Sequence, residues 1–120
     1  MSNIAITVAA GQGDLSAPMD GRFGRAEQFL IVDSETGEVL RALDNPAIND
    51  AHGAGTGAAA LMKKEGIEAV VSGRFGPKAF SALTGLEIVT WIAPSGLTAA
   101  QALALFQQGQ LERMQLQIIR

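Results

Sequence analysis

The sequence predicts an α/β protein in which a five-stranded mixed sheet is covered by helices. Three observations lead to this fold class. Short apolar, β-branched runs recur along the chain and are typical of buried strands. A four-residue turn joins the second and third runs into an antiparallel hairpin, and helical segments alternate with strands after it. A hairpin followed by such alternation indicates a mixed sheet with helices packed on it.

Each element has a local justification in the chain. The strands are expected at residues 4–9, 29–33, 38–43, 69–72 and 86–92. The helices are expected at residues 56–64, 77–83 and 98–109. Gly66 ends the first helix, Pro77 suits a first helical position, and Thr98 with Gln101 forms a capping-box pattern. Residues 111–120 fit a helical face and a strand face equally, so their structure stays open.

Composition restricts the function classes. The 120 residues suit one domain, 1–120, and an apolar content of 48% suits a packed core. A net charge of −3 argues against a broad basic surface for nucleic acid. The absence of cysteine excludes disulfides, thiolate-held zinc and cysteine-ligated iron–sulfur clusters. No run of about 18 apolar residues and no leader pattern occurs, so we expect a soluble cytoplasmic protein without membrane contact.

The glycine-rich loops are expected to meet at one edge of the sheet. Strands one, three, four and five would point the same way, so their carboxyl ends share an edge. The loops that follow them span residues 11–27, 45–53, 73–76 and 94–96. Ligands of open α/β sheets usually bind at this carboxyl edge. The sequence therefore predicts a ligand site there.

The residues at this edge favour an anion. The glycines at 53–57 lead into a helix, whose first N–H groups and positive dipole end suit a negative ligand, although glycines also serve simply to turn the chain. Arginines and a lysine add charged donors, opposed by Asp14, Asp20 and Asp50. The candidate contacts are Arg22, Gly24, Arg25, His52, Gly53, Gly55, Thr56, Gly57, Gly73, Arg74, Gly76 and Lys78.

Three aromatic side chains at these loops have two interpretations each. His52 is the only histidine; it would ligate a soft metal or donate to an anion, or else cap the following helix or face solvent. Phe23 and Phe75 occupy the same place in two Gly-Arg-Phe-Gly segments, at residues 21–24 and 73–76. We expect both rings to anchor their loops in the core, the alternative being that they wall a pocket.

Sequence signatures of common enzymes are missing. No P-loop pattern occurs, and Gly11-Gln12-Gly13 lacks the third glycine and the immediate helix of a dinucleotide fingerprint. No Gly-x-Ser-x-Gly segment occurs, and a single histidine gives little support to a nucleophile–histidine pair. No acid/base constellation emerges, so we expect a protein that is not an enzyme.

Three segments resemble a known family. They are residues 20–26 (Asp-Gly-Arg-Phe-Gly-Arg-Ala) with Phe29-x-Ile31-x-Asp33 after them, residues 52–55 (His-Gly-Ala-Gly), and residues 70–79 (Val-Val-Ser-Gly-x-x-Gly-Pro-Lys-Ala). Together they resemble the dinitrogenase iron–molybdenum cofactor biosynthesis family of the NifX, NafY and NifB C-terminal type. The resemblance covers roughly residues 4–109. Arg74 and Phe75 depart from it, since relatives often have a glycine and a small apolar residue there.

The resemblance implies a fold and a function. It implies an RNase H-like three-layer fold with a five-stranded mixed sheet, and the binding or carrying of metal–sulfur cofactors rather than catalysis. A small cysteine-free chain is most similar to members that hold an anionic molybdenum–copper sulfide cluster without covalent protein ligands; a related iron- or molybdenum–sulfur cluster is the alternative cargo. Such a carrier would be a monomer that delivers its cluster to a protein partner.

Two other function classes stay open. The first is a cofactor-free regulatory or protein-interaction module of the same fold, which would dock through its third helix and its tail. The tail residues concerned are Leu111, Met114, Leu116, Ile118 and Ile119. The second is an enzyme that acts on a phosphorylated small molecule in the same anion pocket, and the missing general base counts against it.

Overall fold

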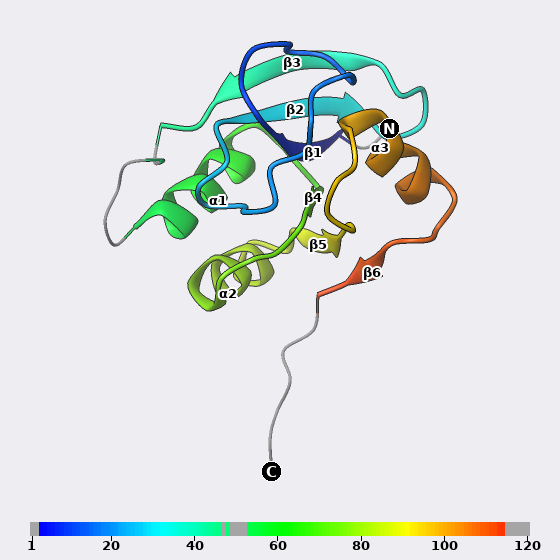
Figure 1. Cartoon of the computed structure of the whole chain (residues 1–120). Helices are drawn as coiled ribbons and strands as arrows, with labels where there is room; N and C mark the ends of the chain where they lie inside the picture. The colour runs from blue at the N-terminus through cyan, green and yellow to red at the C-terminus, as the bar shows by residue number, and fades with distance from the viewer. Residues whose placement is uncertain (1–2, 47, 49–52, 115–120) are drawn as a thin grey trace.

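A computed structural model describes residues 3–46, 48 and 53–114 of the chain. The strands of the described part are β1 (Asn3–Val8), β2 (Gln28–Asp33), β3 (Val39–Asp44), β4 (Ala69–Ser72), β5 (Val89–Ile92) and β6 (Glu112–Arg113). Its helices are α1 (Ala54–Lys64), α2 (Pro77–Gly85) and α3 (Ala99–Gln107). The strands form one mixed sheet in the order β3-β2-β1-β4-β5-β6 (Figure 1). β4 pairs in parallel with both β1 and β5, and the other neighbours are antiparallel.

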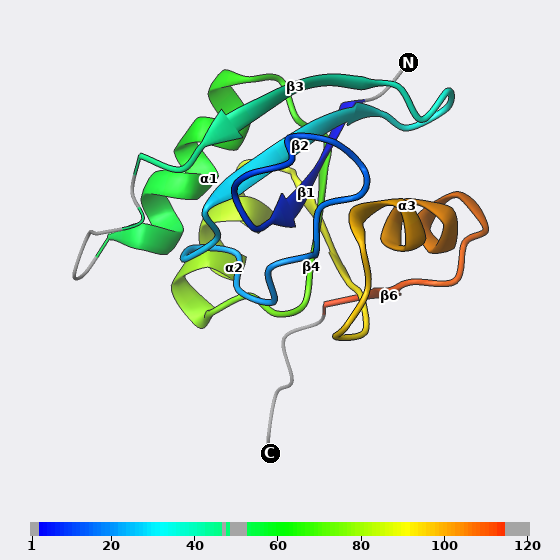
Figure 2. The same cartoon turned by 45° about the horizontal axis from the view of Figure 1, so that its top comes forward.

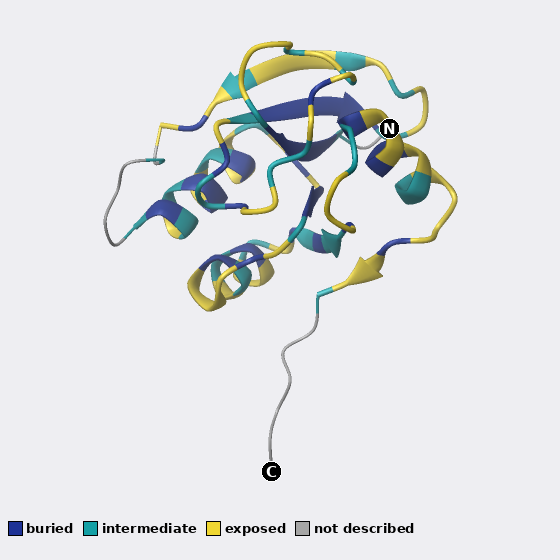
Figure 3. Cartoon of the chain, viewed as in Figure 1, coloured by how far each residue is buried: buried dark blue, intermediate teal, exposed yellow. Residues whose placement is uncertain are grey.

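The sheet is the middle of three layers. Helices α1 and α2 cover one face and α3 covers the other (Figure 2). The side chains of β1 alternate between the two cores, with Ala5 toward α1 and α2, and Ile4 and Ile6 toward α3. Figure 3 shows β2 buried and its edge neighbour β3 largely exposed. This arrangement confirms the predicted three-layer mixed sheet.

The predicted number of strands was wrong, because the sheet has six strands in its described part and not five. Glu112 and Arg113 pair antiparallel with β5, and the Met114 amide donates to the Thr90 carbonyl at 3.0 Å. A two-residue strand is too short to show the alternation from which strands are predicted. The segment left open in the sequence therefore begins as an edge strand; residues 115–120 lie outside the described part.

Most predicted boundaries shift by one or two residues, and two of the starts, those of α1 and β5, shift by more than one residue. α1 begins at Ala54, two residues before the expected start, so most of the glycine segment is helical. β5 begins at Val89 rather than at residue 86, because Leu86 caps α2 and Glu87 has a φ of 63°. A left-handed residue interrupts an extended strand. The capping box that joins Thr98 and Gln101 at the start of α3 is confirmed.

The two Gly-Arg-Phe-Gly segments lie against each other. The rings of Phe23 and Phe75 are buried, as expected, and their centroids are 5.4 Å apart. A Cβ atom on Gly73 would lie 2.8 Å from the Gly21 Cα atom, so the two backbones touch where only glycine fits. The loop after β1 is therefore fastened to the loop after β4. Within the described residues, none of the helices has the length and apolar character that crossing a membrane requires.

Candidate functional site

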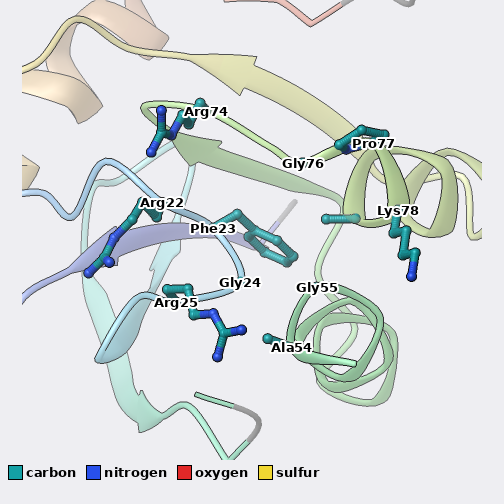
Figure 4. A pocket seen from close by; sticks show the side chains of 11 residues that line it. Arg22, Phe23, Gly24, Arg25, Ala54, Gly55, Arg74, Gly76, Pro77 and Lys78 are labelled. Atoms are coloured by element: carbon teal, nitrogen blue, oxygen red, sulfur yellow. The ribbon is translucent and has the colours of Figure 1, made fainter. Parts of the chain in front are cut away.

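A cavity of about 570 Å³ lies where three loops meet at the carboxyl edge of the sheet (Figure 4). Its lining residues are Arg22, Phe23, Gly24, Arg25, Ala54, Gly55, Arg74, Gly76, Pro77, Lys78 and Ala79. They come from the loop after β1, the start of α1 and the junction of β4 with α2. The predicted convergence is thus confirmed for the loop after β1, the glycine segment at the start of α1 and the loop after β4. The loop at residues 94–96 does not line the cavity; the neighbouring Leu97 carbonyl accepts from the Met19 amide at 2.9 Å.

Small residues let the three segments approach closely. A Cβ atom on Gly24 would lie 3.0 Å from the backbone nitrogen of Gly55. A Cβ atom on Gly55 would lie 2.8 Å from the Cβ atom of Ala79. The loop therefore rests on the start of α1, and α1 rests on the start of α2, with almost no side chain between them. Two helix N-termini consequently open into one cavity.

Asn45, which follows β3, fixes the loop that carries the arginines. Its buried side-chain amide donates to the carbonyl oxygens of Gly24 at 3.1 Å and Ala26 at 2.9 Å. A buried amide with two such bonds holds a loop in one conformation. Asn45 was not predicted as a site residue from the sequence. Its one signal, an asparagine directly after a strand, is also common in ordinary turns.

Both helix N-termini present N–H groups to the cavity. In α1 the first helical hydrogen bond between described residues runs from the Gly57 amide to the Gly53 carbonyl at 2.8 Å, and the amides of Ala54 and Gly55 precede it. In α2 the first such bond runs from Phe80 to Gly76 at 2.9 Å. No side chain of the described residues caps either N-terminus. The positive ends of two helix dipoles therefore meet at the cavity.

Four cations line the same cavity in a chain whose net charge is −3. Arg25 extends toward Ala54 at the start of α1, and its Nη1 atom donates to the Ile48 carbonyl at 2.7 Å (Figure 4). The Nε atom of Arg22 lies 3.4 Å from a carboxylate oxygen of Asp20. Arg74 and Lys78 are exposed, and their side chains have no hydrogen-bond or ion-pair partner among the described residues. None of the described residues that line the cavity is acidic.

The structure brings together most of the predicted site residues. Seven of them line the cavity: Arg22, Gly24, Arg25, Gly55, Arg74, Gly76 and Lys78. The Thr56 hydroxyl donates to the Gly53 carbonyl at 3.1 Å, and Thr56 lines a shallower neighbouring hollow with Lys78. The Gly57 amide is used inside α1, and Gly73 contacts Gly21. His52, like Asp50, lies outside the described residues.

Three apolar residues of the lining, Ala54, Pro77 and Ala79, were not among the predicted contacts. Phe23 belongs both to the core and to the lining, so both interpretations given for its ring apply. Ala79 carries no sequence signal of its own, because its importance depends on its contact with Gly55. Of the tail residues considered for partner docking, Leu111 is buried and Met114 packs against the core. Leu116, Ile118 and Ile119 lie outside the described residues.

The chemistry of this lining suits a large anion. Among residues 3–46, 48 and 53–114, no group of three or more histidine, cysteine or acidic side chains is arranged to hold a metal ion. The cavity offers guanidinium groups, an ammonium group and backbone N–H donors beside an apolar floor. Such donors stabilise negative charge and hydrogen-bond to acceptor atoms on a bound group. They can hold an anion without forming a covalent bond to it.

Comparison with known proteins gives concordant matches. A family model described as dinitrogenase iron-molybdenum cofactor matches residues 4–109. The structure of the apo form of the orange protein from Desulfovibrio gigas is similar, with a TM-score of 0.86, 40% identity and coverage of 95% of this chain and 93% of that chain. A putative NifB protein from Thermotoga is similar, with a TM-score of 0.79, 33% identity and coverage of 94% and 93%. An uncharacterized protein of Methanocaldococcus jannaschii is 36% identical over 95 residues, 78% of this chain and 80% of its own length.

Proposed function

The chain belongs to the dinitrogenase iron–molybdenum cofactor family, and we propose that it is a non-enzymatic carrier that holds an anionic metal–sulfur cluster noncovalently in the cavity at the carboxyl edge. One observation supports this above all. Two helix N-termini that no described side chain caps and four cationic side chains line one cavity, and none of its described lining residues is acidic.

The strength of such binding comes from several modest contributions. A hydrogen bond to a charged group contributes roughly 1.5–3 kcal/mol, and a helix dipole about 0.3–1 kcal/mol. An exposed cation alone contributes little, because water and salt screen it. Retention of a cluster therefore depends on the convergence of the arginines, Lys78 and the N–H groups. This dependence is the reason why charge removal tests the site.

The cargo that the sequence resemblance implies is a molybdenum–copper sulfide cluster. Its terminal sulfides would accept hydrogen bonds from the backbone amides of Ala54 and Gly55 and from the guanidinium groups. The absence of cysteine agrees with noncovalent holding. A related iron- or molybdenum–sulfur cluster would use the same donors. His52 is proposed as a further contact, and the loaded protein is proposed to be a monomer that passes its cluster to a protein partner.

The first experiment is the analysis of metal and acid-labile sulfide in protein purified without air, together with its visible spectrum. We expect molybdenum with sulfide and a charge-transfer band, and copper in addition if the cargo is the mixed cluster. Protein that is colourless after purification is then titrated with tetrathiomolybdate and copper(I). A wild-type chain that neither contains nor takes up these components contradicts the carrier function and favours the interaction module.

A pair of charge variants locates the cluster. Arg22→Ala combined with Arg74→Ala removes two cations from the cavity and should weaken retention at least about tenfold, since each lost charge-assisted contact is worth a severalfold change. Lys63→Ala combined with Lys64→Ala removes the same charge from the last turn of α1 and should leave retention unchanged. Equal retention by both double variants means that the cluster binds elsewhere on the chain.

A further inference from the structure

Two hydroxyl side chains lie near the carboxyl ends of neighbouring strands in the middle of the sheet. Thr7 lies in β1 and Ser72 in β4, both are 0% exposed, and their oxygens are 2.9 Å apart and hydrogen-bonded. A buried hydroxyl is costly unless its hydrogen bonds are satisfied, and valine suits a buried strand better than threonine does. The hydrogen-bond partners of the two hydroxyls therefore indicate why threonine and serine occupy these buried positions.

Thr7 fixes both backbone groups of Asp20. Its hydroxyl oxygen donates to the Asp20 carbonyl at 2.7 Å, and the Asp20 amide donates to the Thr7 carbonyl at 3.0 Å. A hydroxyl has one proton, so when Thr7 donates to Asp20, the hydroxyl of Ser72 supplies the proton that the two hydroxyls share. The pair thereby ties the loop after β1 to the ends of two adjacent strands.

Asp20 in turn holds Arg22. One carboxylate oxygen of Asp20 accepts from the Arg22 backbone amide at 3.0 Å and from its Nε atom at 3.4 Å. The Asp20 side chain is 12% exposed, whereas that of Arg22 is 56% exposed. Thr7, Asp20 and Arg22 thus form a series of hydrogen-bonded residues. Exposure increases from the buried Thr7 to Arg22, whose charged side chain lines the cavity.

We infer that Thr7 is a positioning residue that presets Arg22 for the bound anion through Asp20. The inference rests on the proposed function, because it concerns the same cavity. An arginine that is already held in place loses less side-chain freedom on binding, which raises affinity without any new contact. Thr7 is the informative position to change, because Asp20 also opposes the charge of Arg22 directly, whereas Thr7 carries no charge.

The test is a double-mutant cycle with tetrathiomolybdate as the probe, in anaerobic equilibrium dialysis. Thr7→Val removes the hydroxyl at nearly constant volume and should weaken binding roughly threefold or more, while the same change in an Arg22→Ala background should add no further loss. Thr7→Ser keeps the hydroxyl and should bind within about twofold of the wild type. Thr90→Val removes another buried threonine hydroxyl outside the cavity and should have no effect on binding.

Two results would overturn the inference. An equal loss in both backgrounds means that Thr7 supports the whole cavity and not Arg22, and no loss in either means that it positions nothing. A second readout needs no ligand: hydrogen exchange of the Arg22 backbone amide should be at least about threefold faster in Thr7→Val than in the wild type or Thr7→Ser. If the wild type fails to bind tetrathiomolybdate, the proposed function is wrong. If the Arg22 amide exchanges at the same rate in all three proteins, the positioning role of Thr7 is wrong, whatever the binding result.

Discussion

The amide nitrogen of Phe23 donates a hydrogen bond to the carbonyl oxygen of Arg74 at 3.2 Å. This bond joins two loops that carry the same four residues and follow different strands of the sheet. With the contact between the two phenylalanine rings it gives the loops one common base. Arg22 and Arg74 both flank this junction, so two cations of the cavity share a single structural support.

The close contact at Gly24 predicts a difference between the two glycines of its Gly-Arg-Phe-Gly segment. Gly24→Ala would place a Cβ atom 3.0 Å from backbone atoms of Gly55, and backbone atoms give way reluctantly. We expect the free energy of unfolding to fall by about 1–3 kcal/mol, measured by urea denaturation.

The control is Gly21→Ala, because no heavy atom lies within 4 Å of the added Cβ atom. This variant should change the free energy of unfolding by less than about 0.5 kcal/mol. Equal stability of both variants contradicts the described packing.

Arg25 is predicted to support both the loop after β3 and the bound anion. Arg25→Met keeps most of the side-chain stem but removes the charge and the 2.7 Å bond to the Ile48 carbonyl. We expect weaker uptake of tetrathiomolybdate and a loss of about 1 kcal/mol in the free energy of unfolding. Arg25→Lys retains the charge without the planar donor set and should bind with intermediate affinity. If Arg25→Met binds tetrathiomolybdate with wild-type affinity, Arg25 does not contact the bound anion.

Binding should weaken as salt is added. Arg22, Arg74 and Lys78 are exposed, and the screening length falls from about 10 Å at 0.1 M to about 3 Å at 1 M ionic strength. Titrations with tetrathiomolybdate at increasing potassium chloride should therefore give rising dissociation constants. The slope should be shallower in the Arg22→Ala, Arg74→Ala double variant and unchanged in the Lys63→Ala, Lys64→Ala control. A slope of zero in the wild type would mean that charge contributes nothing to binding.

Asp33 predicts how stability depends on pH. Its carboxylate accepts from the backbone amides of Glu35 at 2.9 Å and Thr36 at 3.2 Å, and these bonds hold the pKa of Asp33 below its ordinary value of 3.8. A lowered pKa in the folded state stabilises the protein above the unfolded value, and this stabilisation is lost as the pH falls through the folded value. Asp33→Asn should therefore unfold more easily in urea near neutral pH, and its difference from the wild type should shrink below pH 3.8.

The control for this titration is Glu38→Gln, which removes an equal charge from an exposed side chain of the same turn. Its stability difference from the wild type near neutral pH should be small, within about 0.5 kcal/mol. If Glu38→Gln and Asp33→Asn destabilise the protein equally, then net charge, and not the pair of hydrogen bonds to Asp33, is responsible.

The features set by local pattern could be predicted from the sequence. Short apolar runs and their turns indicated β1 to β5, and the shared direction of four strands indicated which loops meet. β6 could not be predicted, because Glu112 and Arg113 carry no apolar alternation. The start of β5 was missed because the left-handed backbone of Glu87 has no signature in the side chain, glycine being the usual residue there.

The candidate site was predictable in its charges but less so in its packing. The arginines and Lys78 could be assigned to the cavity because they lie in or next to loops that follow strands at the carboxyl edge of the sheet. The contact of Gly55 with Ala79, and of Gly73 with Gly21, depends on how far apart two segments finally lie, which a single sequence does not state. The same limit explains why Asn45 was missed, since its role comes from the carbonyl groups it reaches rather than from its neighbours in the chain.

The positions of the lining residues in the sequence determine when a newly made chain could bind a ligand. Its lining comes from three segments that are distant in the chain, and the last of them ends at Ala79. Contacts between distant segments form only after long loops have closed, which makes them late steps of folding. A chain still emerging from the ribosome therefore has no cavity until β4 and the start of α2 have been made. The proposed loading of a cluster therefore follows the folding of the chain up to Ala79, because the complete cavity does not exist before then.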